Sequence, residues 1–353
     1  MKKISIILFA MFIIACSSDS NDSSVETAED PRMASSAITN IYATGKVAEQ
    51  SAEQAKKTIF GKWDLGSSSS QSGRENVNCS FSYIEFTEED YLMGLYSSEM
   101  PEDQQNIVVY GTFDMIEVNQ KVTSIKLKTF YEGQSVDIAS VTGIEVKEVN
   151  GALDISFNFN FTTSMENIGV PCGNDLSKDY AAEKEAAMDA TLTADITTNH
   201  YKVVGNWTLS DISEIDQDGQ VSQDFADMFT NYCEDKFEDD FNDGIISTNA
   251  DYEEFLKDCK VPNKSVLKLT TFGSYVFMDL KDDEIIEAEI GVWSWTDDSQ
   301  TKITVGQPGE DQATTGTLVS VTESQLIFTF DEMDYDYDTG QIIQYQITYT
   351  FTK

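Results

Sequence analysis

The sequence has a single histidine, His200, and few basic residues. One histidine excludes most histidine-based metal sites, proton relays and catalytic triads, because these need imidazole groups. Lysine and arginine number 23 against 62 aspartates and glutamates, which gives a formal net charge of −39. A phosphate backbone would repel so acidic a chain. This charge therefore excludes a nucleic-acid partner, and it also excludes a basic helix lying on a membrane surface.

Recognisable catalytic motifs are also missing from the sequence. It contains no Gly-x-Ser-x-Gly elbow, no His-Glu-x-x-His pair and no Gly-rich phosphate loop. Pairs of carboxylates say nothing about hydrolysis in a chain with 62 acidic residues. His200 precedes an expected strand, where a surface or capping role fits it. We therefore expect that the protein is not an enzyme and needs no cofactor.

The hydrophobic run near the N-terminus, residues 4–14, is too short to cross a bilayer as a helix. Two lysines precede the run, and Ala15-Cys16 and a polar stretch follow it. This order resembles a bacterial lipoprotein signal. The resemblance implies a signal peptide over residues 1–15 and acylation of Cys16, palmitate included. The mature chain would then be attached to the outer membrane through lipid alone, and the membrane is its first expected partner.

Residues 16–33 consist mainly of Ser, Asp, Asn and Glu, a composition typical of a flexible tether. An acidic Ser/Asp stretch directly after the lipidated cysteine resembles the surface-export signal of Bacteroidetes lipoproteins. The resemblance favours display on the cell surface, and the periplasmic face of the outer membrane is the alternative.

The remainder of the chain contains an internal repeat. Gly61-Lys62-Trp63 and Gly205-Asn206-Trp207 each follow a helix-like stretch, residues 47–57 and 176–192. Further blocks recur in the same order: Ile84-Glu85-Phe86-Thr87 with Leu267-Lys268-Leu269-Thr270, Tyr91 with Tyr275, Gly111 with Gly291, and Gly143 with Gly316. The blocks alternate apolar and polar residues, and Asn-Gly marks a hairpin between two of them. The pattern predicts a mainly β chain with two tandem antiparallel domains, each preceded by a short helix. Each sheet is expected to close on itself, which removes its edges.

These ordered blocks resemble the lipocalin-like domain found in many Bacteroidetes lipoproteins, over most of residues 45–165 and 195–353. The resemblance implies small up-and-down barrels. It also implies that Trp63 and Trp207 close the bases of the barrels, and that a barrel can hold a small apolar ligand. The expected parts of the chain are the signal peptide 1–15, the acidic tether 16–33, barrel 34–165, a helical linker 166–200, and barrel 201–353 with a helical insertion at 211–262.

The insertion is the most distinctive part of the second copy. Phe225, Phe229 and Tyr232 recur at helical spacing, and a second short helix is expected over residues 252–259. In a small barrel, a long first loop lies over the open end. The insertion is therefore either a lid or docking flap, or a decoration whose apolar face packs on the barrel wall.

Four cysteines remain once Cys16 is lipidated, and an even number in an oxidising compartment predicts disulfides. Cys233 and Cys259 fall in the two adjacent helical stretches of the insertion, so we pair them. Elimination then pairs Cys79 with Cys172. The alternative is that these cysteines are buried thiols.

Two weaker patterns remain as candidate binding sites. Asp216 and Asp218 precede a glycine as in a calcium loop, but the glutamate that such a loop requires is missing. A solvated acidic turn is the alternative, and we assign no metal there. We expect one of Trp293 and Trp295 to face outward, where its ring could stack on a sugar or pack under the insertion.

The sequence therefore indicates a non-enzymatic, lipid-anchored binding or interaction protein of the cell envelope. Its expected partner is an unknown envelope protein or a small apolar ligand. The alternative is an accessory glycan-binding surface lipoprotein. The inward positions carry large side chains, which leave little room in a barrel of this size, so protein binding fits at least as well as carriage of a small molecule.

Overall fold

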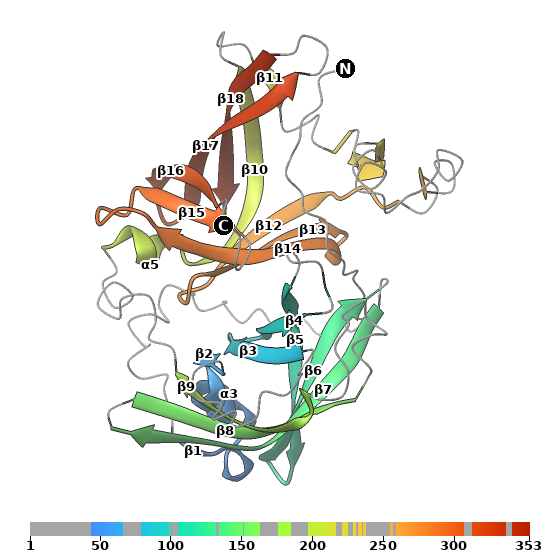
Figure 1. The fold of residues 1–353 in the computed structure, drawn as a ribbon, viewed down its shortest axis with the longest axis vertical. Helices are drawn as coiled ribbons and strands as arrows, with labels where there is room; N and C mark the ends of the chain where they lie inside the picture. Colours follow the sequence, from blue (N-terminus) through green and yellow to red (C-terminus); the bar gives the residue numbers. More distant parts are fainter. Residues whose placement is uncertain are drawn as a thin grey trace.

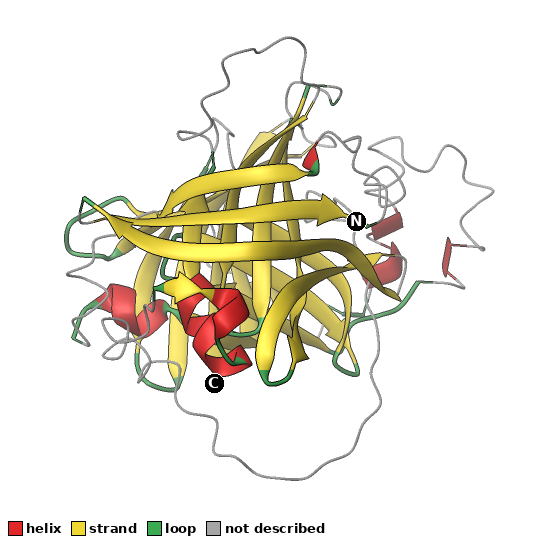
Figure 2. Cartoon of the chain, turned by 90° about the horizontal axis from the view of Figure 1, so that it is seen from below, coloured by secondary structure: helices red, strands yellow, loops and turns green. Residues whose placement is uncertain are grey.

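Strands dominate the computed structural model, and its helices are short (Figure 2). The described residues are 44–65, 79–98, 100, 105–131, 134–150, 152–162, 176–184, 197–216, 221–224, 229–230, 232–234, 236–237, 255–256, 259–306, 313–336 and 341–353. Within them, no helix is long and apolar enough to cross a membrane. The prediction of a mainly β chain is confirmed.

The first nine strands form one antiparallel sheet, in the order β1-β7-β6-β5-β4-β3-β2-β9-β8 (Figure 1). An additional pairing of β7 with β8 closes this sheet into a barrel. Its elements are β1 (Gly45–Lys46), η1 (Val47–Glu49), α3 (Ala52–Ile59), β2 (Gly61–Asp64), β3 (Cys79–Phe86), β4 (Asp90–Ser97), β5 (Asn106–Val118), β6 (Lys121–Tyr131), β7 (Gln134–Val149), β8 (Ala152–Phe161) and β9 (Lys178–Lys184). We call it the first barrel.

The second sheet follows the same plan, in the order β11-β10-β12-β13-β14-β15-β16-β17-β18, and an additional pairing of β10 with β18 closes it. Its elements are α5 (Asn199–Val203), β10 (Gly205–Asp216), β11 (Val221–Asp224), β12 (Lys264–Leu269), β13 (Ser274–Lys281), β14 (Glu284–Trp295), β15 (Lys302–Gly306), β16 (Thr314–Val321), β17 (Gln325–Asp336) and β18 (Gln341–Thr352). This is the second barrel, and the prediction of two tandem barrel-like sheets is confirmed.

The base of each barrel contains its repeated tryptophan. Trp63 and Trp207 are both 0% exposed. Each indole N–H donates to the carbonyl four residues earlier, at 2.7 Å for Trp63 and 2.6 Å for Trp207. An ammonium group lies over each ring, from Lys184 at 4.9 Å and from Lys353 at 4.3 Å. Both tryptophans therefore occupy the same core position of their barrels.

Backbone geometry repeats between the barrels as well. Gly61 and Gly205 begin the first strands with φ angles of +125° and +124°, a region that favours glycine. Further along, Gly111 lies opposite Tyr91 and Gly291 lies opposite Tyr275. A side chain at Gly111 would clash with the backbone, because a Cβ atom there would lie 1.8 Å from the Lys128 carbonyl oxygen. These pairings give a residue-by-residue correspondence between the barrels.

The prediction of a helix over residues 176–192 is wrong where this stretch is described. Residues 178–184 form β9, which pairs with β8 and β2. Alanine and glutamate favour a helix here. Burial overrides this preference, because Ala182 and Tyr180 alternate into the core of the first barrel. The first sheet therefore takes a strand from the expected linker, and α5 is the short helix that precedes the second barrel.

Two other boundaries differ from the expected ones. The helix expected over residues 47–57 is a short 3-10 turn followed by α3, which Ser51 caps by accepting from the N–H of Gln54 at 3.4 Å. The insertion does not start at residue 211. A register shift between Leu209 and Asp211 lets β10 continue against β18 as far as Asp216.

Candidate functional site: the mouth of the second barrel

The end of the second barrel that lies opposite its tryptophan base is its mouth. β10 runs from Gly205 at the base to Asp216, and β12 returns from Lys264. The insertion therefore leaves and rejoins the barrel at the mouth. Its described short segments, drawn in yellow in Figure 1, lie at one side of the barrel.

Acidic side chains occupy the inner wall of β13 and β14 near the mouth. Asp279 lies opposite Glu287 in the sheet. Glu287 and Glu289 alternate in step with the buried Trp293, and residues two apart on a strand share a face. The hydroxyl of Tyr275 donates to Glu289 at 2.5 Å. These carboxylates therefore point to the same side of the sheet as the core.

Asp279 is the most deeply buried of these carboxylates, with 3% of its surface exposed. Burial raises its pKa to about 6, and the negative charges of Glu287 and Glu289 act in the same direction. The hydroxyl of Ser265 donates to its carboxylate at 2.5 Å and opposes the shift, as does the charge of Lys236. The protonated form of Asp279 therefore stabilises the fold below about pH 4, and this stabilisation is lost as the pH rises through about 6.

Two further strands bring glutamates toward the same region. Glu214 of β10 is buried, and Glu332 of β17 accepts a hydrogen bond from the Tyr345 hydroxyl at 3.4 Å. Burial raises the pKa of Glu332, and the charge of Glu214 raises it further. Burial also raises the pKa of Tyr349, and the charges of Glu332, Glu289 and Glu214 add to this effect. Carboxylates from β10, β14 and β17 therefore converge around one tyrosine.

The first barrel has apolar residues at the equivalent positions. Leu95, Ile107 and Val109 stand where the second barrel has Asp279, Glu287 and Glu289, as the pairing of Tyr91 with Gly111 and of Tyr275 with Gly291 shows. All three belong to or pack against the core of the first barrel. At these three positions, the inner wall is therefore acidic in the second barrel and aliphatic in the first.

Aromatic rings extend the apolar interior of the first barrel. Phe81 lies 5.1 Å from Phe159 and 5.2 Å from Tyr180, and Phe157 stacks on Tyr180 at 5.7 Å, as measured between ring centroids. These positions match the large inward residues expected from the sequence.

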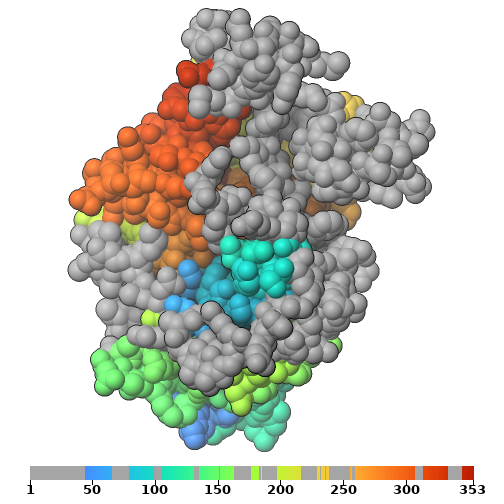
Figure 3. All heavy atoms as spheres, viewed as in Figure 1, coloured from blue at the N-terminus to red at the C-terminus, as the bar shows by residue number. Residues whose placement is uncertain are grey.

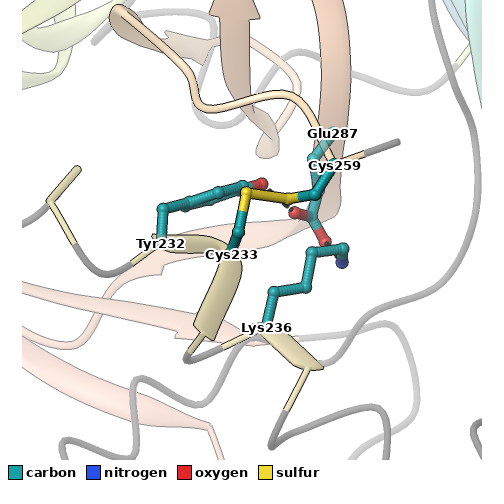
Figure 4. Close-up of a disulfide and its surroundings, with 5 residues drawn as sticks. All are labelled: Tyr232, Cys233, Lys236, Cys259 and Glu287. Carbon is teal, nitrogen blue, oxygen red and sulfur yellow. Dashed lines mark hydrogen bonds and ion pairs between the residues drawn. A yellow bond between two sulfur atoms is a disulfide. The ribbon is translucent and has the colours of Figure 1, made fainter. Parts of the chain in front are cut away.

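The insertion contacts the acidic wall directly. The hydroxyl of Tyr232 donates to Glu287 at 2.6 Å, and the Lys236 ammonium pairs with the same carboxylate at 3.0 Å (Figure 4). Cys233 lies between these two residues in the sequence and forms a disulfide with Cys259. The Cα atoms of the two cysteines are 6.0 Å apart. The disulfide links the two parts of the insertion close to the residues that hold Glu287.

The other predicted site residues are dispersed. Phe229 lies half-buried in a turn of the insertion, and Asp216 is the last residue of β10. Cys79 is disulfide-bonded. Four predicted positions fall outside the described residues: Cys16, Cys172, Asp218 and Phe225. Among the described residues, no group of three potential ligands is arranged to hold a metal ion.

The expectation that one of Trp293 and Trp295 faces outward is wrong. The two residues lie two apart on β14 and share a face. Their rings meet edge to face at 5.6 Å, and the Trp295 indole N–H donates to Nδ1 of His200 at 3.2 Å. His200 is fully buried and stacks on Trp293 at 5.1 Å, so it is a core residue and not a surface one. Trp293 is buried and Trp295 is half-buried, so both belong to the interior face of β14.

Sequence reasoning did not detect the acidic wall. Glu287 and Glu289 alternate with Ala288 and Ile290, and alternation alone does not say which face is the interior. The comparison that reveals the wall is between the two copies, since the aligned positions of the first copy are aliphatic.

No protein-family model matches the chain, and none of the curated proteins matches it. Among solved structures, a variant of the vaccine antigen transferrin binding protein B from Haemophilus parasuis is similar at 9% sequence identity and a TM-score of 0.19. That match covers 77% of this chain and 53% of the other. A similarity this low carries no argument about fold or function.

Proposed function

We propose that this chain is a non-enzymatic, lipid-anchored binding protein of the cell envelope, and that it binds cationic groups at the mouth of the second barrel. The observation that carries the proposal is the replacement of aliphatic inward residues of the first barrel by Asp279, Glu287 and Glu289. Asp279 is buried and the two glutamates are half-buried, and negative charge that is withdrawn from water is stabilised by a positively charged partner.

The insertion supports the same chemistry. Lys236 already pairs with Glu287, so an ammonium group is accommodated at the acidic wall. Tyr232 holds the other oxygen of this carboxylate. A primary amine or guanidinium, either of a small molecule or of a lysine or arginine on an envelope protein, would find the same partners.

Spermidine is a suitable probe, and isothermal titration calorimetry on the full chain in detergent is the measurement. We expect wild-type protein to bind spermidine, and the double variant Glu289→Gln, Glu332→Gln to bind it about tenfold more weakly or worse. Glutamine keeps the acceptor oxygen for Tyr275, so the fold is retained. Lys236→Met removes the resident ammonium and is expected to tighten binding.

Exposed Glu53 provides the matched control, because Glu53→Gln removes charge far from the mouth. This variant should bind spermidine within about twofold of wild type, since exposed charges are screened by salt. Equal binding by wild type and by the Glu289, Glu332 double variant would refute the proposed site. Unchanged binding by the Lys236→Met variant would indicate that the insertion is a decoration.

The anchor is tested separately. Cys16→Ser is expected to release the protein from membranes or to leave the signal peptide uncleaved, because the thiol is the group that carries the lipid. Membrane fractionation with mass spectrometry of the N-terminus measures both outcomes. A Cys16→Ser protein that is still acylated and membrane-bound would contradict the lipoprotein assignment.

A further inference from the structure

The two barrels pack against each other through an apolar surface. Figure 1 shows β13 and β14 directly above β4 and β5, and the space-filling view in Figure 3 places the two colour ranges in contact. Leu92 and Val276, both 0% exposed, belong to one cluster that spans this boundary. The other members come from both barrels: Tyr83, Val108, Tyr110, Val266, Met278, Leu280, Ile285, Ala288 and Ile290.

Equivalent positions of the two repeats supply this surface. The alignment of Tyr91 with Tyr275 makes Leu92 equivalent to Val276. In the same way Tyr110 corresponds to Ile290, and Val108 corresponds to Ala288. An interface in which the same patch is used on both sides is isologous, as in a two-fold symmetric dimer. The two barrels therefore pair as a pseudo-symmetric dimer within one chain.

Polar contacts at the boundary obey the same symmetry. Lys268 binds Asp90 with nitrogen–oxygen distances of 2.5 and 2.6 Å, and their side chains are 14% and 12% exposed. On the other side of the approximate two-fold axis that relates the two barrels, the Ser274 hydroxyl donates to the buried Glu85 at 2.6 Å. Glu85 is equivalent to Lys268.

The equivalence of Asp90 and Ser274 completes this symmetry. Each lies directly before the repeated tyrosine, and each is joined through a backbone hydrogen bond of 2.9 Å to the repeated threonine of its barrel. These threonines are Thr87 and Thr270, whose N–H groups donate to the carbonyls of Asp90 and Ser274. One contact therefore joins Lys268 of the second barrel to Asp90 of the first. The other joins the equivalents of these two residues with the barrels exchanged, Glu85 of the first barrel and Ser274 of the second.

The charges at these positions differ between the barrels, and this difference determines which pairings are stable. Two first barrels meeting through this surface would place Glu85 against Asp90 of the other copy, twice, in a poorly solvated boundary. Two carboxylates held together there are strongly unfavourable unless one takes up a proton, and burial already raises the pKa of Glu85. Either state is less stable at neutral pH than the opposite charges of Lys268 and Asp90. We propose that Glu85 and Lys268 are the specificity residues of an isologous barrel-pairing surface, which direct the first barrel to the second barrel of the same chain and away from a first barrel of another copy.

Charge variants of the full chain in detergent test this proposal, with light scattering for mass, small-angle X-ray scattering for compactness and circular dichroism for strand content. Lys268→Glu places a carboxylate against Asp90, so we expect a monomer with a larger radius of gyration and wild-type strand content. Adding Asp90→Lys restores an opposite pair, so Lys268→Glu with Asp90→Lys should be as compact as wild type.

The double variant Glu85→Lys, Lys268→Glu exchanges the two specificity residues. It breaks the pair within the chain, but in a dimer of first barrels each introduced lysine would face Asp90 of the other copy. We expect this variant to form dimers, whereas wild type and Lys268→Glu stay monomeric. The proposal is overturned if Lys268→Glu keeps the wild-type radius of gyration, or if the exchanged variant stays monomeric. Neither outcome depends on ligand binding at the mouth.

Discussion

Replacing Trp63 or Trp207 by alanine is expected to lower the free energy of unfolding by about 3–5 kcal/mol in each case. Both indoles are fully buried, and each donates a hydrogen bond to the last residue of the helix that precedes its strand. Alanine leaves a cavity at the base of a barrel, removes the aromatic face beneath Lys184 or Lys353, and leaves a buried carbonyl without its donor.

Urea unfolding of the full chain, followed by circular dichroism, measures this loss. Phenylalanine is the matched control, because Trp63→Phe and Trp207→Phe keep an aromatic ring and most of the apolar volume, and lose the indole N–H. We expect the phenylalanine variants to lose clearly less stability than the alanine variants. A loss below about 1 kcal/mol for both alanine variants would show that these residues are not core positions, since surface substitutions stay within that range.

Removing the buried ion pair at the barrel boundary should have an effect of similar size. Asp90→Ala leaves the ammonium of Lys268 without its carboxylate, and also removes the acceptor of the Tyr110 hydroxyl at 3.0 Å. Breaking a buried pair by deleting one partner costs about 3–5 kcal/mol, because a charge is left uncompensated.

An exposed pair on the first barrel is the control. Lys126 and Asp137 lie 2.8 Å apart with side chains 42% and 45% exposed. Asp137→Ala should change stability by only about 0–1 kcal/mol. Differential scanning calorimetry compares the two variants. Equal small losses would mean that water screens the Asp90–Lys268 pair, in contradiction to the packed boundary between the barrels.

The repeat made much of the fold predictable. The aligned tyrosines and tryptophans, and the glycine pairs Gly61 with Gly205 and Gly111 with Gly291, lie at matching positions in both sheets. Each marks a local requirement: positive φ, a close backbone approach or a core indole. The aligned Gly143 and Gly316 differ, because Gly143 lies in a register break with positive φ and Gly316 is paired within its strand. Strand β9 was missed, since its Ala and Glu residues favour a helix and only long-range pairing with β8 makes it a strand.

The candidate site was less predictable. Which face of β14 is interior depends on closure of the barrel, and not on the local pattern. The pairing of Lys268 with Asp90 joins residues 178 positions apart, which no local signal reveals. The disulfide was predictable because its cysteines fall within one insertion, in separate helical stretches.

Hydrogen–deuterium exchange with mass spectrometry, on the full chain with and without spermidine, tests most directly whether the mouth of the second barrel is the binding end. We predict slower exchange on addition of spermidine in β13, β14 and the insertion around Tyr232, with exchange in β4 and β5 unchanged. The slower exchange would then include the segments around Tyr232 and Tyr275, whose hydroxyls donate to Glu287 and Glu289. Protection confined to the first barrel, or spread evenly over the acidic surface, would contradict this account.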